Sequence, residues 1–318
     1  MAIVYGKAPG KIILFGEHAV VYGQPAIAIP VTKVKATARI YPAIHKSQGW
    51  LGIEAKDINL NTTLSELPTE NPINMAISLT LQKIKPTHTP AMQLQISSTI
   101  PIGGGMGSSA AISIAIIHAL SSFLGQPFSK GEISDLAYEV EKIHHGTPSG
   151  IDNSVIAYQT PIYFQRKRPI EFLKISKQSH WVIADSGEST PTLETVAAVR
   201  AQYNANPEKT GKFLKKIGKI TEKARFALEN GDIKVLGELV NENQQALREL
   251  ELSSKKIELL IKSARRAGAV GAKLSGGGRG GNIIALCYEE NIPSIIEMLE
   301  QAGATRVFAT RLAESEVS

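Results

Sequence analysis

The sequence predicts a chain of mixed helices and strands, of the α/β or α+β class, that divides into two domains. Three observations predict this class: a length of 318 residues, a composition of 43% hydrophobic and 20% charged residues, and short apolar strands that alternate with helices. The sequence shows no internal repeat of fixed period and no long low-complexity linker. The chain is therefore long enough to bury a substantial core and has the size of an ordinary enzyme.

The expected elements of the first domain begin with a strand in AIVYGKAPGKIILFG and a second strand in KVKATARIYPAI. A polar, hairpin-like HKSQGW follows, and helices are expected near 72–85 and 108–123. Charge and proline interrupt the pattern at QRKRP, which predicts a boundary between a domain of residues 1–165 and one of residues 166–318.

The second domain is expected to begin with the strand HWVIADSG. The pattern then predicts a run of helices near 191–204, 209–230, 232–249 and 254–267. Strand, glycine loop, strand and helix follow, and TRVFATRL forms a last strand.

Composition excludes several classes of protein. Cys287 is the single cysteine, so there is no disulfide framework and no cysteine pair for zinc, and a reducing cytoplasm fits best. No basic segment precedes an apolar stretch at Met1, so no signal peptide is expected. The uncharged run Ser108–Gly125 contains five serines and a histidine, and it predicts a buried helix rather than a membrane span. The net charge of +6 comes from lysines spread over helical segments, which favours a solvated face over a nucleic-acid surface.

The first glycine-rich loop, PIGGGMGSSAA, runs directly into the apolar helix expected from residue 108. Backbone N–H groups and the positive end of the helix dipole would converge there and form an anion seat. The alternative is a tight turn in which Ser108 or Ser109 caps the helix. No Gly-Lys-Ser/Thr follows, so this is not a Walker A loop.

The second glycine-rich loop, KLSGGGRGGN, covers Lys273 to Asn282 and lies between two strands. Five glycines in six positions would be costly in a mere hairpin, because glycine loses the most conformational freedom on folding.

Charged residues near these loops have the character of a phosphoryl-transfer site. Lys11 follows Ala-Pro-Gly and leads into a buried run, which favours a cleft over a surface position, and Glu141 and Asp152 flank the broken stretch HGTPSG. Such a reaction needs a metal ligand, an acid that orients the hydroxyl, and cations for the developing charge. Glu141 with His144 also resembles half of a di-iron motif, but the sequence lacks the second half, and His144 and His145 fit a helix end better.

Three segments together resemble the motifs of the GHMP kinases, the superfamily of galactokinase, homoserine kinase, mevalonate kinase and phosphomevalonate kinase. They are APGKIILFGEHAVV (the first motif, Ala8–Val21), PIGGGMGSSAA (the second motif, Pro101–Ala111) and KLSGGGRGG (the third motif, Lys273–Gly281). The stretch HGTPSGIDN is similar to the form found in mevalonate kinases. The resemblance spans nearly the whole chain, from Ala8 to the final strand.

The resemblance implies an α+β fold of two domains: an N-terminal domain with a left-handed crossover, a ferredoxin-like C-terminal domain, and an active site between them. It implies Asp152 as the catalytic acid-base residue, Lys11 beside the accepting hydroxyl, and Ser109 and Glu141 as ligands of Mg²⁺. It also places substrate near Glu17, His18 and Thr192, although the lysine that often follows this threonine is Leu193 here. ATP would be bound by Pro101, Gly103, Gly104, Gly105, Gly107, Ser108, Ser109, Gly276, Gly277 and Gly278.

Some residues depart from the family pattern. Gly104 stands where alanine is usual and Met106 where leucine is, both small changes for the loop. Arg279 interrupts the third motif and either contacts the triphosphate or points to solvent.

The implied activity is ATP- and Mg²⁺-dependent phosphorylation of the primary hydroxyl of mevalonate. The rival enzyme is a phosphomevalonate kinase or a kinase of the mevalonate 3-hydroxyl, and the rival from another class is a nucleic-acid-binding module. The expected partners are mevalonate and ATP, with no nucleic acid and no membrane. The sequence does not reveal the oligomeric state, and a homodimer is one arrangement that it allows.

Overall fold

The computed structural model describes residues 3–101, 104–145 and 148–313, which form two compact units. The first unit comprises Met1–Lys11, Pro30–Pro101 and Gly107–Gln159. The second unit comprises Ile12–Ile29, Ile102–Met106 and Thr160–Ser318. The chain therefore passes between the units more than once, because strands β1 and β2 contribute residues to both. The domain boundary at residues 165 and 166 stays a prediction.

The sheet of the first unit has the strand order β4-β3-β5-β2, and β1 also pairs with β2. Its strands are β1 (Val4–Phe15), β2 (Ala26–Pro42), β3 (Leu51–Ala55), β4 (Leu60–Thr63) and β5 (Met92–Ser98). The pairing is antiparallel between β2 and β5 and parallel between β3 and β5. The expectation of a hairpin at HKSQGW is therefore wrong, because β5 lies between β2 and β3. The backbone of this connection bonds to the residues before β5 instead: Ala43 donates to the Ala91 carbonyl and Gly49 to that of Thr89, both at 2.9 Å.

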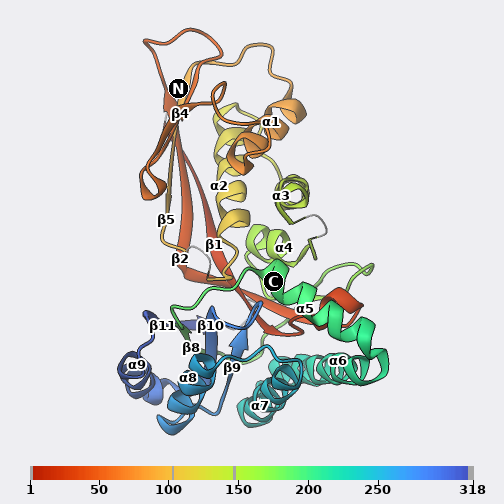
Figure 1. Cartoon of the computed structure of the whole chain (residues 1–318). Helices are drawn as coiled ribbons and strands as arrows, with labels where there is room; N and C mark the ends of the chain where they lie inside the picture. Colours follow the sequence, from red (N-terminus) through yellow and green to blue (C-terminus); the bar gives the residue numbers. More distant parts are fainter. Residues whose placement is uncertain (1–2, 102–103, 146–147, 314–318) are drawn as a thin grey trace. The chain divides into compact units, whose positions relative to one another are not determined.

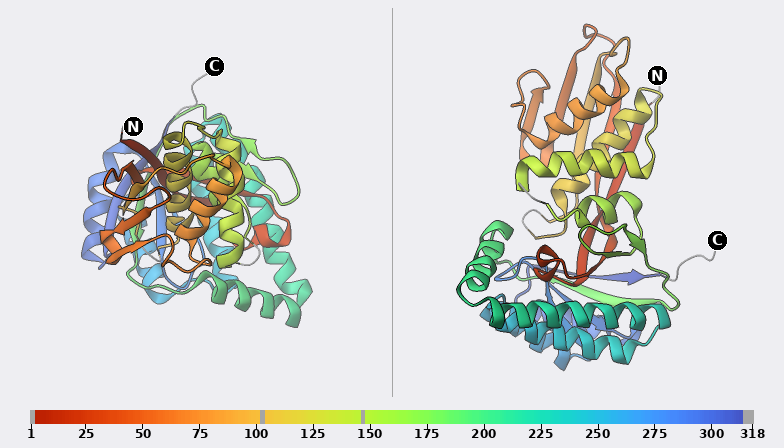
Figure 2. Two further views of the ribbon diagram at one scale, coloured as in Figure 1. Left: turned by 90° about the horizontal axis from the view of Figure 1, so that it is seen from above. Right: turned by 90° about the vertical axis from the view of Figure 1, so that its right-hand side faces the viewer.

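Four helices accompany this sheet: α1 (Pro72–Ile84), α2 (Ser108–Phe123), α3 (Lys130–His145) and α4 (Ile151–Tyr158) (Figures 1 and 2). Asn71 caps α1 by accepting from the Ile73 amide at 2.9 Å, and Pro72 suits the first helical position. Helix α2 buries most of its alanines and isoleucines, so the prediction of a buried helix from residue 108 is confirmed. Among the described residues, no helix combines the length and the apolar composition that a bilayer span requires.

The second unit contains an antiparallel four-stranded sheet in the order β11-β8-β10-β9. The strands are β8 (Ser179–Asp185), β9 (Gly271–Ser275), β10 (Asn282–Cys287) and β11 (Arg306–Leu312). The short strand β6 (Ile162–Phe164) pairs antiparallel with the start of β2, and β7 (Glu171–Phe172) pairs antiparallel with β6.

Helices α7 (Ile233–Glu249), α8 (Lys255–Arg266) and α9 (Ile292–Gln301) cover one face of the four-stranded sheet, and α5 (Thr192–Ala205) and α6 (Pro207–Asn230) precede them (Figure 1). The buried core of this unit includes Val182, Leu247, Leu260 and Ile283. The helices and strands expected for the second half of the chain are confirmed to within a few residues.

Strand β9 lies at the edge of its sheet, and side chains occupy its outward backbone groups. Asn241 Oδ1 accepts from the Ala272 amide at 3.2 Å, and Gln244 Oε1 accepts from the Leu274 amide at 2.9 Å. The carbonyl of Ala272 accepts from Arg265 Nη2 at 2.8 Å, and that of Leu274 accepts from Lys273 Nζ at 2.7 Å. We call this arrangement the sealed edge of β9.

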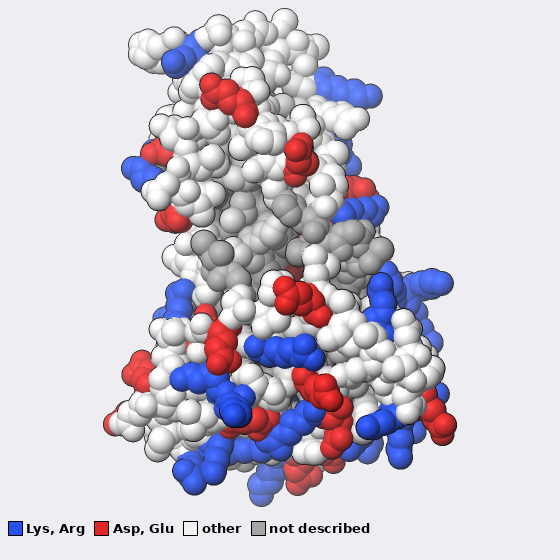
Figure 3. Space-filling view, viewed as in Figure 1, with Lys and Arg blue, Asp and Glu red and all other residues white. Residues whose placement is uncertain are grey.

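Charged side chains of both signs are interspersed over the second unit (Figure 3). On α6, the exposed positions include Lys209, Lys212, Lys215, Lys216, Lys219 and Lys223. The remaining face of this helix packs through Leu214, Ile217, Ile220 and Leu228. An amphipathic helix of this kind turns its lysines towards water and its apolar face towards the core.

Candidate active site

Lys11 and Asp152 form an ion pair in the first unit, with Lys11 Nζ 2.9 Å from Asp152 Oδ1. Lys11 lies on β1 and is buried, whereas 27% of the Asp152 side chain is exposed. Asp152 is the second residue of α4, so its carboxylate lies in the first turn, where the helix dipole favours negative charge. The pair thus combines a partly exposed carboxylate with a buried ammonium.

The start of α4 is held by its neighbours. Gly150 precedes the helix with φ of 90°, a left-handed conformation that glycine adopts without strain. Asn153 then donates from Nδ2 to the backbone carbonyl of Ser134 at 3.1 Å and to its hydroxyl at 2.9 Å, both on α3. These bonds fix Asp152 relative to α3. The broken stretch between Glu141 and Asp152 separates two helices, since α3 ends at His145 and α4 begins at Ile151.

Glu141 lies in the last turn of α3 and is 5% exposed. Burial raises the pKa of its carboxyl to about 8, the charge of Asp152 raises it too, and Lys11 acts in the opposite direction. A buried carboxyl near a second carboxylate tends to keep its proton until a cation replaces it. The two acids and Lys11 therefore form one electrostatic group.

The second motif opens α2 as predicted. Gly105 and Gly107 have φ of 69° and 72°, and Ser108 and Ser109 are the first two residues of the helix. A Cβ at Gly107 would lie 3.0 Å from Lys11 Cγ and 2.8 Å from Ile156 Cδ1. Gly107 therefore makes room for the aliphatic part of Lys11. Pro101 is half-buried, and Gly103 lies outside the described residues.

The third motif forms the loop between β9 and β10 in the second unit, as the sequence predicts. Its backbone takes positive φ at Gly276, Gly278, Arg279, Gly280 and Gly281. Arg279 is held at φ 57° and donates from Nε to the Glu251 carbonyl at 3.1 Å. Its side chain therefore follows the turn between α7 and α8, where it bonds to backbone.

Residues of the first motif hold this loop. Glu17 forms an ion pair with Lys273, and both side chains are fully buried. His18 approaches the Gly277 carbonyl with Nε2 at 2.8 Å, and Ser275 Oγ donates to the Ile13 carbonyl at 2.8 Å.

His18 is neutral in this setting. Burial lowers its pKa from 6.5 to about 4, the bond to Gly277 opposes the shift, and the charge of Arg279 adds to it. A carbonyl only accepts hydrogen bonds, so Nε2 of the neutral ring carries the proton and donates it.

The remaining predicted residues also cluster at this loop. Asn282 Nδ2 donates to the Gly104 carbonyl, which joins the second motif to the residue that directly follows the third. Thr192 is the first residue of α5 and is exposed, and a Cβ at Gly277 would lie 3.3 Å from its hydroxyl oxygen.

The structure therefore gathers the predicted residues into one group in each unit. Lys11, Glu141 and Asp152 contact or influence one another in the first unit. Glu17, His18 and Thr192 surround the third motif in the second unit. Sequence reasoning gave no role to Lys273, Ser275 or Asn282. The signal for Lys273 was available: a lysine between alanine and leucine in a buried strand needs a buried acid.

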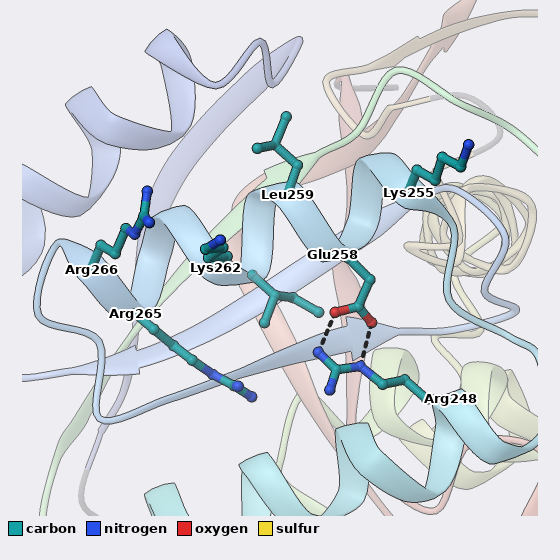
Figure 4. A pocket seen from close by; sticks show the side chains of 8 residues that line it. Arg248, Lys255, Glu258, Leu259, Lys262, Arg265 and Arg266 are labelled. Carbon is teal, nitrogen blue, oxygen red and sulfur yellow. Dashed lines mark hydrogen bonds and ion pairs between the residues drawn. The ribbon is translucent and has the colours of Figure 1, made fainter.

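Among the described residues, no group of three or more His, Cys, Asp and Glu side chains could hold a metal ion. A hollow of about 560 Å³ lies over α8, lined by Arg248, Lys255, Glu258, Leu259, Ile261, Lys262, Arg265 and Arg266 (Figure 4). Arg248 pairs there with Glu258, with Nε 2.7 Å from Oε1. None of the predicted site residues lines this hollow.

The two-unit α+β fold and these motif loops are those of a family of small-molecule kinases. The GHMP kinases N terminal domain matches residues 71–160, and the GHMP kinases C terminal domain matches residues 224–305. The chain belongs to the GHMP kinases, so the predicted family and its two-domain α+β fold are confirmed.

Curated relatives of this chain include archaeal mevalonate kinases. The mevalonate kinase of Pyrococcus horikoshii is 37% identical over 89% of this chain and 88% of its own length. That of Thermococcus onnurineus is 39% identical over 95% and 94%.

Solved structures agree with the relatives. Methanococcus jannaschii mevalonate kinase has a TM-score of 0.86 at 28% identity, with 99% of both chains covered. L. major mevalonate kinase in complex with R-mevalonate has a TM-score of 0.83 at 26% identity, covering 99% of this chain and 97% of that one. Streptococcus pneumoniae phosphomevalonate kinase, at 18% identity and a TM-score of 0.82, shares the fold alone.

Proposed function

We propose that this chain transfers the γ-phosphoryl group of ATP to the primary hydroxyl of mevalonate and forms mevalonate 5-phosphate. The observation that carries the proposal is the Lys11–Asp152 pair at 2.9 Å beside the buried Glu141, in a member of the GHMP kinases whose relatives are mevalonate kinases. The rival substrate phosphomevalonate has weaker support, because the phosphomevalonate kinase among the structural neighbours shares only 18% identity.

In this proposal Asp152 orients the substrate hydroxyl and accepts its proton. The hydroxyl oxygen forms a bond to the γ-phosphorus while the bond from that phosphorus to the β–γ bridging oxygen breaks and ADP leaves. An alcohol gives up its proton as this transfer proceeds, so the carboxylate acts mostly in the transition state. Lys11, at 2.9 Å from Asp152, orients that carboxylate and stabilises the developing negative charge on the oxygen.

The first unit also suits the Mg²⁺ that this chemistry uses. Mg²⁺ takes one or two protein carboxylates and completes its shell with waters and substrate phosphates. Glu141 fits the first role, because burial and Asp152 raise the pKa of its carboxyl to about 8, and a cation would relieve both effects. Ser109 would add a hydroxyl from the first turn of α2. The bound ion would neutralise charge on the phosphates.

The glycine-rich segments are proposed to bind ATP. Gly104, Gly105, Gly107, Ser108 and Ser109 would present backbone amides at the start of α2, where the helix dipole favours anions. Gly276, Gly277 and Gly278 would do so from the loop after β9. Glu17, His18 and Thr192 are proposed to lie near the substrate. We also propose a cytoplasmic location, and a homodimer is the assembly to test in solution.

The test is a coupled ADP-release assay of the purified protein with mevalonate, phosphomevalonate, homoserine and galactose. We expect turnover with mevalonate, and phosphorus NMR of the product should place the new phosphate on the primary hydroxyl. Turnover with phosphomevalonate alone, or a product phosphorylated on the 3-hydroxyl, would replace this function by that of the rival kinase. A folded protein that binds RNA in a salt-sensitive manner and turns over no substrate would overturn the assignment as a kinase.

A further inference from the structure

The first motif contacts β9 and the loop that follows it through three residues. Ile13 bonds to Ser275 through both its amide and its carbonyl, at 3.2 and 2.8 Å. Glu17 pairs with Lys273, and His18 donates to the Gly277 carbonyl. Lys273 and Ser275 lie two residues apart on β9, so their side chains project from the same face of the strand, whereas Gly277 lies beyond the end of β9 and is contacted through its carbonyl. The first motif therefore contacts β9 at two residues and the start of the loop at a third.

Lys273 has two partners in this arrangement. Its ammonium pairs with Glu17 and donates to the Leu274 carbonyl at the sealed edge of β9, at 2.7 Å. One side chain thus joins the edge strand to the first motif, three residues before the glycine run begins at Gly276.

Because the pair is buried, its main contribution is to the position of the two side chains rather than to stability. Both side chains have no exposed surface, and burial lowers the pKa of Lys273 against the opposing effect of Glu17. Desolvation of two charges offsets much of their attraction, and apolar residues of similar volume often stabilise as well or better. What charged partners add is a defined geometry, because each restricts where the other can lie.

The glycine run needs such a restriction. Gly276, Gly278, Gly280 and Gly281 have φ of 97°, 78°, 148° and 73°, and glycine pays more conformational entropy on ordering than any other residue. Beyond the glycines, Asn282 fixes the far end of the loop through Gly104. The near end depends on the contacts of the first motif.

We propose that Lys273 and Glu17 are a positioning pair that sets the third glycine loop in the conformation that binds the phosphates of ATP, without touching the nucleotide. The proposal rests on the proposed function, because the loop's ligand is taken from it. It gives Glu17 a role distinct from direct contact with substrate.

The experiment compares Lys273→Met, the double variant Glu17→Gln/Lys273→Met, and Glu17→Asp with the wild-type chain. Arg225→Met is the matched control: Arg225 pairs with Glu171 at 2.8 Å in the same unit, and neither residue belongs to the loop or the first motif. Three quantities are measured on each: the thermal midpoint, the dissociation constant of ATP by calorimetry, and hydrogen exchange of the amides of residues 276–281.

Lys273→Met should lower the thermal midpoint strongly, because it removes the lysine from a buried carboxylate. The double variant, with two uncharged side chains of similar size, should recover most of the midpoint. It should still bind ATP on the order of tenfold more weakly and exchange the loop amides faster, because the uncharged pair packs without fixing the loop. Glu17→Asp, which keeps both charges but shortens one arm, should show a smaller effect of the same kind. The control should change neither loop exchange nor ATP affinity.

The proposal is overturned if the double variant keeps wild-type ATP affinity and wild-type exchange of the loop amides. If the double variant fails to fold, wild-type ATP affinity and loop exchange in Glu17→Asp would overturn it. Activity and ATP binding of the wild-type chain test the proposed function separately from the positioning role. If the wild-type chain phosphorylates mevalonate and the variants bind ATP normally, only the positioning role fails. If loop exchange responds to Lys273 but the wild-type chain binds no ATP, the proposed ligand fails.

Discussion

The neutral, buried His18 should contribute to the stability of this protein at neutral pH, and this contribution should be lost on acidification. The pKa of His18 is 6.5 in an ordinary setting and about 4 in the folded chain. Between these values the unfolded chain binds more protons, so the free energy of unfolding rises with pH across this window. The contribution of His18 is fully present above the higher value and is lost as the pH falls towards the lower one.

The difference between the two pKa values corresponds to about 3 kcal/mol once the pH is below both. Lowering the pH from about 7.5 to about 5 should remove about 2 kcal/mol of this, because the unfolded histidine is then almost fully protonated and the folded one scarcely at all. The raised pKa of Glu141, about 8, acts with the opposite sign: the folded chain holds the extra proton, so acidification over this range stabilises it.

The assay is urea unfolding of the wild-type chain and of His18→Gln at both pH values. Glutamine has no titrating group, and its amide can donate to the Gly277 carbonyl as the imidazole does. The effect of Glu141 is common to both proteins and cancels in the comparison. We expect the wild type to lose about 2 kcal/mol more than the variant on acidification. Equal losses would show that the pKa of His18 in the folded chain is not lowered by burial.

Three further substitutions test the site. Asp152→Asn should lower kcat by about 10²–10⁴-fold with little change in ATP affinity, and a folded variant that keeps more than about a tenth of wild-type kcat would remove Asp152 as the base. Glu141→Gln should raise the Mg²⁺ concentration needed for half-maximal activity, because it removes a charge from the proposed shell; an unchanged Mg²⁺ titration with normal turnover would contradict this role. Arg279→Gly should leave the KM for ATP near the wild-type value, since Nε bonds to the Glu251 carbonyl at 3.1 Å, and a selective rise in this KM would show that the guanidinium contacts phosphate.

Local pattern was enough to predict most elements of this fold. Helices such as α7 and α8 carry their own signals, since Asp232 and Ser254 cap them and apolar residues recur along one face. The placement of β3 was not predictable in this way. Strands β2 and β3 are joined by a short polar segment that favours a hairpin, and only the pairing of β5 with both strands shows that they are not neighbours.

The residues of the candidate site likewise divide into those that local sequence predicts and those that it does not. Glycines that open a helix and acids that flank a broken helix are visible in the sequence, and they led to Gly107, Glu141 and Asp152. The partners of Glu17 were not visible, because Lys273 lies 256 residues further along the chain. Contacts over such a separation follow from the whole topology, which no local window contains.

The sealed edge of β9 has a consequence for how this protein meets other copies of itself. An edge strand with vacant N–H and C=O groups is a template onto which another chain can add a strand. Here Asn241, Gln244, Arg265 and Lys273 already occupy the outward groups of Ala272 and Leu274. Asn241, Gln244 and Arg265 come from α7 and α8, which precede β9 in the chain and so leave the ribosome before it. During synthesis the strand therefore emerges after most of its covering residues. A dimer formed by extending this sheet would have to begin at β11.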